Sequence, residues 1–320
     1  MNQQNSLSIV CKPAKLKPET KAHIAVLSTN LFFAVNFSLV KYVSPALIRP
    51  YAINILRVGV SLILFWLLWT IGDTKPHIKR KHWPRFFLCG LTGIAINQIF
   101  FIKGLTYTSA IHASLLILLT PILITVFAFT ILKEKVTIVK ALGLALGIGG
   151  AVLLIVSKEQ SASATNYLLG DLLIVINAIS YTVYFIIVKP LMKEYPPLHV
   201  VRWVFTFGFI MILPFGWNEF FATPWERLDW SHLASLFFIV VFGTFLAYFF
   251  NIYGIQHLGA GVTGSYIYTQ PVFAALIAVI FFHEQLTPAK LLAGIMIFLG
   301  VFLVSFKRGS LNKSLGVIEE

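Results

Sequence analysis

Residues 104–153 read GLTYTSAIHASLLILLTPILITVFAFTILKEKVTIVKALGLALGIGGAVL, and residues 254–303 read GIQHLGAGVTGSYIYTQPVFAALIAVIFFHEQLTPAKLLAGIMIFLGVFL. The two stretches align without a gap at a constant offset of 150 positions, and the alignment pairs Gly104 with Gly254, Ala110 with Ala260, Pro121 with Pro271, Ala128 with Ala278, Glu134 with Glu284, Thr137 with Thr287, Lys140 with Lys290, Leu142 with Leu292, Gly150 with Gly300 and Leu153 with Leu303. Such a repeat in an apolar chain is typical of membrane transporters built from two copies of one helical unit.

The composition also predicts an all-α integral membrane protein. Of the 320 residues, 58% are hydrophobic and 12% are charged, whereas about a quarter of the residues in a soluble protein are charged. Apolar runs of about 18 or more residues recur along the chain, and each is long enough to cross a hydrocarbon layer of roughly 30 Å. Because the backbone must satisfy its own hydrogen bonds in lipid, these runs predict helices.

The apolar runs predict ten transmembrane spans, five in each half, near residues 22–40, 51–71, 84–103, 109–131, 139–157, 168–188, 198–217, 232–254, 262–282 and 288–306. The expected organisation is an N-terminal tail (1–21), a first five-helix repeat (22–157), a linker (158–167), a second five-helix repeat (168–306) and a C-terminal tail (307–320). An odd number of spans in each copy gives the two repeats opposite orientations in the membrane. Inverted repeats are the usual architecture for alternating access.

The basic residues predict the orientation of the chain. The net charge is +13. With the N-terminal tail in the cytoplasm, 17 Lys and Arg residues fall on the cytoplasmic side and six on the opposite side, namely Lys41, Arg49, Lys103, Lys158, Arg227 and Lys290. This positive-inside bias places both termini in the cytoplasm. The charge lies in short loops without a nucleic-acid-binding motif, so we expect no nucleic-acid partner.

The chain resembles the ten-helix branch of the drug/metabolite transporter superfamily, which is made of two EamA domains. The resemblance covers roughly residues 22–306 and rests on Gly104-Leu-Thr-Tyr-Thr-Ser-Ala110, Ala113, Ser114, Leu115, Pro121, Glu134 and Thr137, on Gly254-Ile-Gln-His-Leu-Gly-Ala260, Pro271, Glu284 and Thr287, and on Arg57 and Arg202. It implies a carrier for small metabolites, often an exporter of amino acids or similar solutes. The Phe-Tyr-Asn-Asn and Gly-Ala-Leu-Asn-Lys signatures of nucleotide-sugar carriers do not occur in the sequence.

Polar side chains form stripes along three predicted spans. Asn177, Tyr181 and Tyr184 are spaced i, i+4, i+7, as are Thr244, Tyr248 and Asn251, and Tyr266 lies four positions before Gln270. Each set lies on one face of a helix. The stripes predict either a substrate cavity or hydrogen bonds between helices, and the spacing alone leaves both open.

The two repeats differ at many of these polar positions. Tyr181 and Tyr184 correspond to Ala34 and Phe37, and Tyr266 corresponds to Leu116. Hydrogen bonds that the fold itself needs should recur in both copies, so the asymmetry favours a cavity for an asymmetric solute. The predicted substrate-binding residues are Asn30, Asn97, Gln98, Asn177, Tyr181, Tyr184, Tyr248, Asn251, Tyr266, Tyr268 and Gln270.

Six further residues are candidates for a hinge or a gate: Pro121, Pro271, Glu134, Glu284, Arg57 and Arg202. The two matched prolines predict kinks in the fourth and ninth helices. For the two glutamates, a structural role at a helix corner is favoured over gating. The two arginines, each disfavoured in a span by about 2.5–3.5 kcal/mol, either line the cavity or neutralise a substrate carboxylate, or extend their side chains to lipid headgroups.

The predicted function is a secondary transporter in the cell membrane that moves a small metabolite by alternating access, as a monomer or a homodimer in the lipid bilayer. No Asp or Glu lies deep in a predicted span, and His112 is interpreted as structural, so transport without a buried carboxylate relay is expected. The alternative is a membrane-embedded enzyme acting on a lipid-linked substrate. The sequence has no clustered catalytic groups or metal ligands for such an enzyme, and we expect no cofactor.

Overall fold

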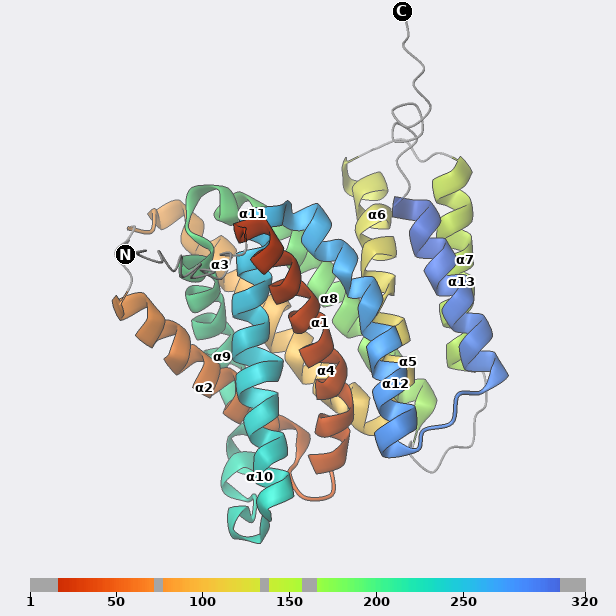
Figure 1. The fold of residues 1–320 in the computed structure, drawn as a ribbon. Helices are drawn as coiled ribbons and strands as arrows, with labels where there is room; N and C mark the ends of the chain where they lie inside the picture. The colour runs from red at the N-terminus through yellow and green to blue at the C-terminus, as the bar shows by residue number, and fades with distance from the viewer. Residues whose placement is uncertain (1–16, 72–76, 133–137, 157–165, 306–320) are drawn as a thin grey trace, which may run out of the picture.

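The computed structural model describes residues 17–71, 77–132, 138–156 and 166–305, and all regular elements in these ranges are helical. Eight helices are long and apolar enough to cross a membrane, and two shorter apolar helices cover Ala110–Leu123 and Pro288–Leu303. Together these ten elements occupy the positions of the ten predicted spans. The fold is therefore that of a multi-pass membrane protein (Figure 1).

Within its described residues, the first half of the chain forms seven α-helices and two short segments of other helical types. The α-helices are α1 (Pro18–Val43), α2 (Pro50–Ile71), α3 (Trp83–Gly90), α4 (Asn97–Tyr107), α5 (Ala110–Ile117), α6 (Leu119–Leu132) and α7 (Ile138–Val156). A 3-10 turn, η1 (Arg80–His82), precedes α3, and a π-helical segment, η2 (Leu91–Ile96), joins α3 to α4.

The second half follows the same plan. Its α-helices are α8 (Tyr167–Glu194), α9 (Pro197–Phe221), α10 (Trp230–Phe237), α11 (Ala247–Ser265), α12 (Gln270–Phe282) and α13 (Pro288–Ser305). The π-helical segment η4 (Phe238–Leu246) joins α10 to α11, and the 3-10 segments are η3 (Trp225–Arg227) and η5 (Tyr266–Thr269). At the repeat offset of 150, η2 corresponds to residues 241–246, which lie within η4, so both copies widen the third helix of the repeat at an overlapping place. Such π-bulges are frequent at functional sites.

Both matched prolines lie where a helix is interrupted. Pro121 is the third residue of α6, directly after the break at Leu118. Pro271 is the second residue of α12, directly after the 3-10 segment η5. Because proline lacks the N–H that would continue the preceding turn, each break follows from the local sequence. The structure thus places a discontinuity at the same position in both copies.

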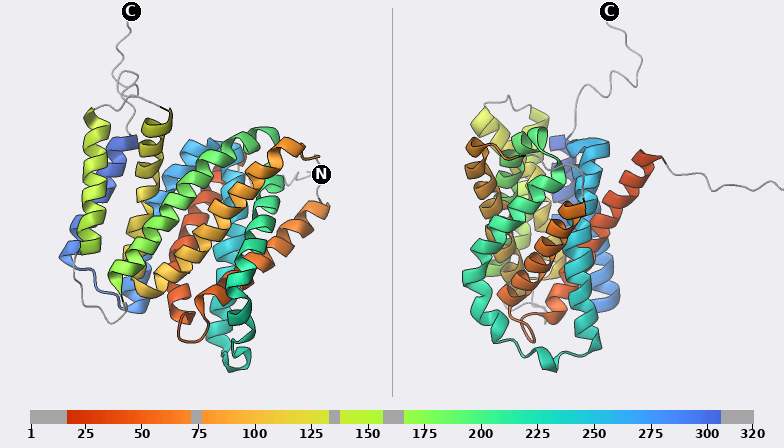
Figure 2. Two further views of the ribbon diagram at one scale, coloured as in Figure 1. Left: turned by 180° about the vertical axis from the view of Figure 1, so that it is seen from behind. Right: turned by 90° about the vertical axis from the view of Figure 1, so that its left-hand side faces the viewer.

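The packing of the helices has an approximate twofold relationship. Helix α1 packs against α11, and its counterpart α8 packs against α4; likewise α12 packs against α1 while α5 and α6 pack against α8. Helices α2 and α9, which correspond to each other, form one pair, and α7 and α13 form another. In Figure 1, α1, α11 and α12 form the front layer, and Figure 2 shows α8 and α4 on the opposite face.

The α7–α13 pair lies at one side of the bundle and depends on small residues (Figures 1 and 2). A Cβ atom added at Gly300 would lie 2.5 Å from the backbone nitrogen of Gly147 and 2.6 Å from the carbonyl oxygen of Gly143. Only glycine permits this approach of the two backbones. The Gly143-x-x-x-Gly147 spacing therefore serves packing within the chain.

The start of α1 and the end of α13 lie at the same end of the bundle in Figure 1. We call the opposite end, where α1 ends and α5 begins, the outer end, because the positive-inside bias predicts that it faces away from the cytoplasm.

Candidate functional site

Polar side chains from both repeats meet in the interior of the bundle. Asn177 on α8 donates from Nδ2 to the backbone oxygen of Asn97 at 2.8 Å. Gln98 donates from Nε2 to Asn97 Oδ1 at 3.1 Å and to the Tyr248 hydroxyl at 3.4 Å. Asn54 on α2 donates to the backbone oxygen of Gln98 at 3.0 Å. We call Asn54, Arg57, Asn97, Gln98, Asn177, Thr244 and Tyr248 the interior polar cluster.

Arg57 completes this cluster through the π-helical segment η4. Its Nε donates to Thr244 Oγ1 at 2.9 Å, and its Nη2 donates to the carbonyl oxygen of Gly243 at 3.4 Å. The side chain of Thr244 is fixed in turn by a 2.8 Å bond to the carbonyl oxygen of Ile239. The widened turn of η4 thus presents both partners to a guanidinium from the other repeat, and Arg57 is only 2% exposed.

The paired tyrosines of α8 lie beside the first π-helical segment. The rings of Tyr181 and Tyr184 have centroids 5.8 Å apart. A Cβ atom added at Gly93 in η2 would lie 2.4 Å from Cδ2 of Tyr184, so the ring packs directly on the glycine backbone. The ring of Tyr248 packs edge-on against Phe205, with centroids 5.0 Å apart. Tyrosine rings with apolar faces and hydroxyl groups suit an amphipathic ligand.

A second polar group connects α1 to the ninth span. Gln270 donates from Nε2 to Asn30 Oδ1 at 2.8 Å, and both side chains are buried. Tyr266 lies nearer the other end of α1, where its hydroxyl is 2.7 Å from His23 Nδ1. Of the remaining predicted residues, Asn251 is half-buried on α11, and Tyr268 packs against the hydrophobic core.

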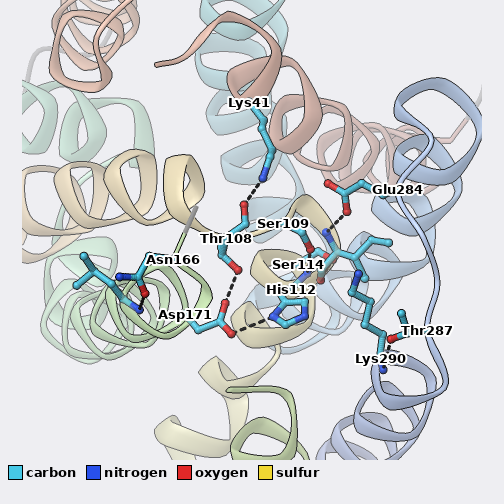
Figure 3. A network of polar contacts seen from close by, with 12 residues as sticks. Lys41, Thr108, Ser109, His112, Ser114, Asn166, Asp171, Glu284, Thr287 and Lys290 are labelled. Atoms are coloured by element: carbon cyan, nitrogen blue, oxygen red, sulfur yellow. Dashed lines mark hydrogen bonds and ion pairs between the residues drawn. The ribbon is translucent and has the colours of Figure 1, made fainter. Parts of the chain in front are cut away.

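At the outer end, Asp171 and His112 form a completely buried pair between the repeats (Figure 3). His112 Nδ1 lies 2.9 Å from Asp171 Oδ2, and the side chains of both residues are 0% exposed. The hydroxyl of Thr108 donates to the other carboxylate oxygen, and the Lys41 ammonium donates to the carbonyl oxygen of Thr108. A charged group this deeply buried depends on such partners. Asp171 is thus buried despite its position near the start of its span.

Glu284 closes the same end from the other repeat. Its carboxylate accepts from the backbone N–H of Ala110 at 3.0 Å and from that of Ile111 at 3.4 Å, at the N-terminus of α5 (Figure 3). A carboxylate satisfies the free N–H groups at a helix start and is attracted by the helix dipole. The predicted counterpart, Glu134, lies outside the described residues.

Arg202 has different surroundings from Arg57, although both lie early in the second helix of a repeat. Its Nη2 is 3.0 Å from His199 Nδ1. The guanidinium carbon lies 4.3 Å from the ring centroid of Trp66 and 4.0 Å from that of Trp69. These are cation–π contacts. From the sequence, both arginines have the same candidate roles. The structure places Arg57 against the polar π-helical segment η4 and Arg202 beside indole rings.

A cavity of about 330 Å³ lies between α2, α4, α8 and α9. Its lining is largely apolar and includes Ile96, Ile99, Phe100, Leu173, Met211 and Phe215. None of the predicted substrate-binding residues and no member of the interior polar cluster lines this cavity.

Three polar contributors were missing from the predicted site: Asn54, Thr244 and Asp171. Asn54 is a single amide in an apolar span, so the stripe pattern that identified the other residues did not include it. Thr244 was part of a stripe, but threonine also bonds to its own helix backbone and is a weak signal. Asp171 is the only acidic residue in the first turns of the predicted sixth span, and that position could have identified it.

Comparison with known proteins agrees with this architecture of two copies. The model of the EamA-like transporter family matches residues 20–156 and again residues 168–306. The two matches together cover most of the chain, one for each repeat. The chain belongs to the EamA-like transporter family and is a multi-pass membrane transporter.

Individual relatives extend over nearly the whole chain. An uncharacterized transporter of Archaeoglobus fulgidus is 26% identical over 288 residues, which cover 90% of this chain and 100% of the relative. A WAT1-related protein of Arabidopsis thaliana is 24% identical and covers 92% of this chain and 88% of its own length. A solved crystal structure with 18% identity has a TM-score of 0.58 and covers 89% of this chain and 97% of its own, which shows a shared fold.

Proposed function

We propose that this chain is a secondary carrier of the cell membrane that moves a small metabolite, such as an amino acid or a related solute, by alternating access. The proposed binding site is the interior polar cluster together with Tyr181 and Tyr184. The observation that supports it most is the origin of the cluster: Arg57 and Gln98 come from the first repeat, and Thr244 and Tyr248 from the second. A solute bound there would contact both halves of the transporter.

The contacts at the outer end support the alternating-access part of the proposal. Glu284 of the second repeat binds the start of α5 in the first repeat, and Asp171 of the second repeat pairs with His112 of the first. Access from the outer end requires these contacts between the repeats to separate. The discontinuities at Pro121 and Pro271 give each repeat a position at which half of a span can move relative to the other half.

The experiment is a metabolite screen with the purified protein in liposomes. The rate of transport of each solute found in the screen is then measured for the variants Tyr181→Ala, Tyr248→Ala and Tyr266→Ala. We expect the variants of the proposed binding site, Tyr181→Ala and Tyr248→Ala, to raise KM by roughly tenfold because each loses a ring contact and a hydroxyl group. The matched control is Tyr42→Phe, because Tyr42 is 44% exposed at the outer end. Transport that is unaffected in both Tyr181→Ala and Tyr248→Ala would count against the site.

A further inference from the structure

Arg57 carries a positive charge into the interior of the bundle without a negative partner. In the described residues, no carboxylate lies within salt-bridge distance of its guanidinium, and no aromatic ring lies over it; its partners are a hydroxyl group and a backbone carbonyl oxygen. Its Nη1 is buried and has no hydrogen-bond partner in that part of the chain. A guanidinium keeps its charge under all physiological conditions. One edge of a permanent cation therefore remains unsatisfied.

The depth of Arg57 makes this arrangement costly. Arg57 is the eighth residue of α2, which has 22 residues. At 1.5 Å per residue, it lies about 10 Å along the helix from its start, roughly a third of the way through the span. The side chain is 2% exposed, so water does not solvate the charge. Buried cations of this kind in membrane helices usually face a substrate or ion pathway.

The corresponding arginine of the second repeat shows that the fold itself does not require this arrangement. The charge of Arg202 is compensated by the indole rings of Trp66 and Trp69, at 4.3 and 4.0 Å. Such a cage stabilises a guanidinium without an anion. Arg202 also leaves Nε and Nη1 without a hydrogen-bond partner among the described residues, so the unpaired nitrogens alone do not distinguish the two arginines. The difference is that indole rings lie over the guanidinium of Arg202, whereas no ring in the described part of the chain lies over that of Arg57. Arg57 is therefore the arginine whose charge an anion would compensate.

Several side chains near Arg57 have the opposite need: they are hydrogen-bond acceptors that lack a donor. Asn36 Oδ1, Asn54 Oδ1 and Gln98 Oε1 are buried acceptors without a donor among the described residues. Asn36 packs against Gly243, whose carbonyl oxygen accepts from Arg57. The cluster thus leaves a strong donor beside several free acceptors. A solute with both an acidic group and a donor group would satisfy both sets, whereas a cation without an acidic group would be repelled by Arg57.

We propose that Arg57 is the anion-binding group of the carrier and that the transported solute carries a carboxylate that docks on its Nη1. Planar guanidinium groups bind carboxylates through paired N–H groups, and Nη1 together with the second hydrogen of Nη2 forms such an edge. This inference rests on the proposed function, because it assigns a chemical role within the same interior polar cluster.

The test compares solutes that differ only at the acidic group. Amino acids, their amides and their desamino acids compete for uptake into proteoliposomes that contain the wild type, Arg57→Lys, Arg57→Gln or the matched control Arg202→Lys. In the wild type and in the control, we expect the acids to compete roughly ten- to a hundredfold better than the amides. Arg57→Lys should reduce this ratio, and Arg57→Gln should abolish it. Elution as a single species in size-exclusion chromatography and the midpoint of thermal unfolding show whether each variant is folded. If Arg57→Gln is not folded, the comparison of Arg57→Lys with the wild type provides the test.

Three results would overturn the inference. The first is a ratio of acid to amide competition in Arg57→Lys that equals the wild-type ratio. The second is a wild type that transports only neutral or cationic solutes, which leaves the proposed function intact and removes the role of Arg57. The third is a wild type that transports no solute at all, which overturns the proposed function as well.

Discussion

The carboxylate of Glu284 caps the helix that begins at Ala110, with Oε1 3.0 Å from the backbone nitrogen of that residue. The two residues belong to different repeats, so this bond holds the outer end of one repeat against the other. Glu284→Gln keeps the shape of the side chain and removes its charge. We expect it to weaken the closed outer end by about 1–2 kcal/mol, because a charged acceptor at a helix start is lost.

The opening is measured by the labelling rate of a cysteine at Ala113, which is 0% exposed on α5. The measurement uses protein in which Cys11 and Cys89 are replaced by Ser and a maleimide that does not cross the membrane. Glu284→Gln should label faster than the parent protein, and Glu226→Gln, which changes an exposed glutamate in η3, should not. Equal labelling rates in Glu284→Gln and the parent protein would argue against an outer gate at this position.

The buried Asp171–His112 pair should be energetically coupled. A double-mutant cycle with Asp171→Asn and His112→Gln is expected to give a coupling free energy of about 1–3 kcal/mol, because either single change leaves a buried polar group without its partner. Thermal unfolding in detergent provides the stabilities. The pair of Asp229 and His232, at 2.6 Å, whose side chains are 64% and 15% exposed, is the comparison and should be less coupled. A buried pair that is no more coupled than the partly exposed one would contradict the role assigned to its burial.

Gly300 should not tolerate a larger side chain. Gly300→Ala would place a Cβ atom 2.5 Å from the backbone nitrogen of Gly147, which cannot rotate away. We expect a loss of stability of about 1–3 kcal/mol. The control is Gly149→Ala, whose Cβ atom would meet only the end of Met296, at 3.4 Å. A change of oligomeric state at unchanged stability would instead indicate that this surface contacts a second copy of the chain.

The two prolines should control the rate of conformational exchange. Pro121→Ala and Pro271→Ala are expected to slow solute exchange more than they weaken solute binding, because each restores a continuous helix across the discontinuity. Exchange of labelled solute and equilibrium binding are measured on the same preparation. Pro214→Ala alters a proline inside α9 that has no counterpart in the repeat, and it serves as the control. Unchanged exchange in both repeat variants would rule out these positions as hinges.

The sequence predicted the ten-helix fold in detail because its signals are local. Apolar length marks each span, and proline marks several helix starts as well as both internal breaks. The gap-free match of Pro121 with Pro271 also predicted that the breaks coincide. The π-helical segments escaped prediction, because they follow from packing against the other repeat rather than from composition. Gly93 and Gly243 lie in these segments, and their importance is visible only from their contacts with Tyr184 and Asn36.

The candidate site could be predicted less completely from the sequence, because its contacts also join residues of different repeats. Helical spacing grouped Asn177 with Tyr181, but it could not show that Asn177 bonds to the Asn97 backbone in another repeat. It also gave no means of separating Arg57 from Arg202. The expectation of transport without a buried acidic group rested on position along the span. Asp171 is completely buried, and it lies near the start of α8, as the sequence indicated, so this expectation stays a prediction.

The most direct test of the account is whether the interior polar cluster is reached alternately from both sides of the membrane. A cysteine replaces Asn177, which is 4% exposed, in protein that lacks Cys11 and Cys89, and a small impermeant thiol reagent is applied to vesicles of each orientation. If this cluster is the substrate site of an alternating-access carrier, the reagent reacts from both sides and a saturating transported solute slows both reactions. Reaction from one side only, or no protection by the solute, would contradict a substrate site at this cluster in an alternating-access carrier.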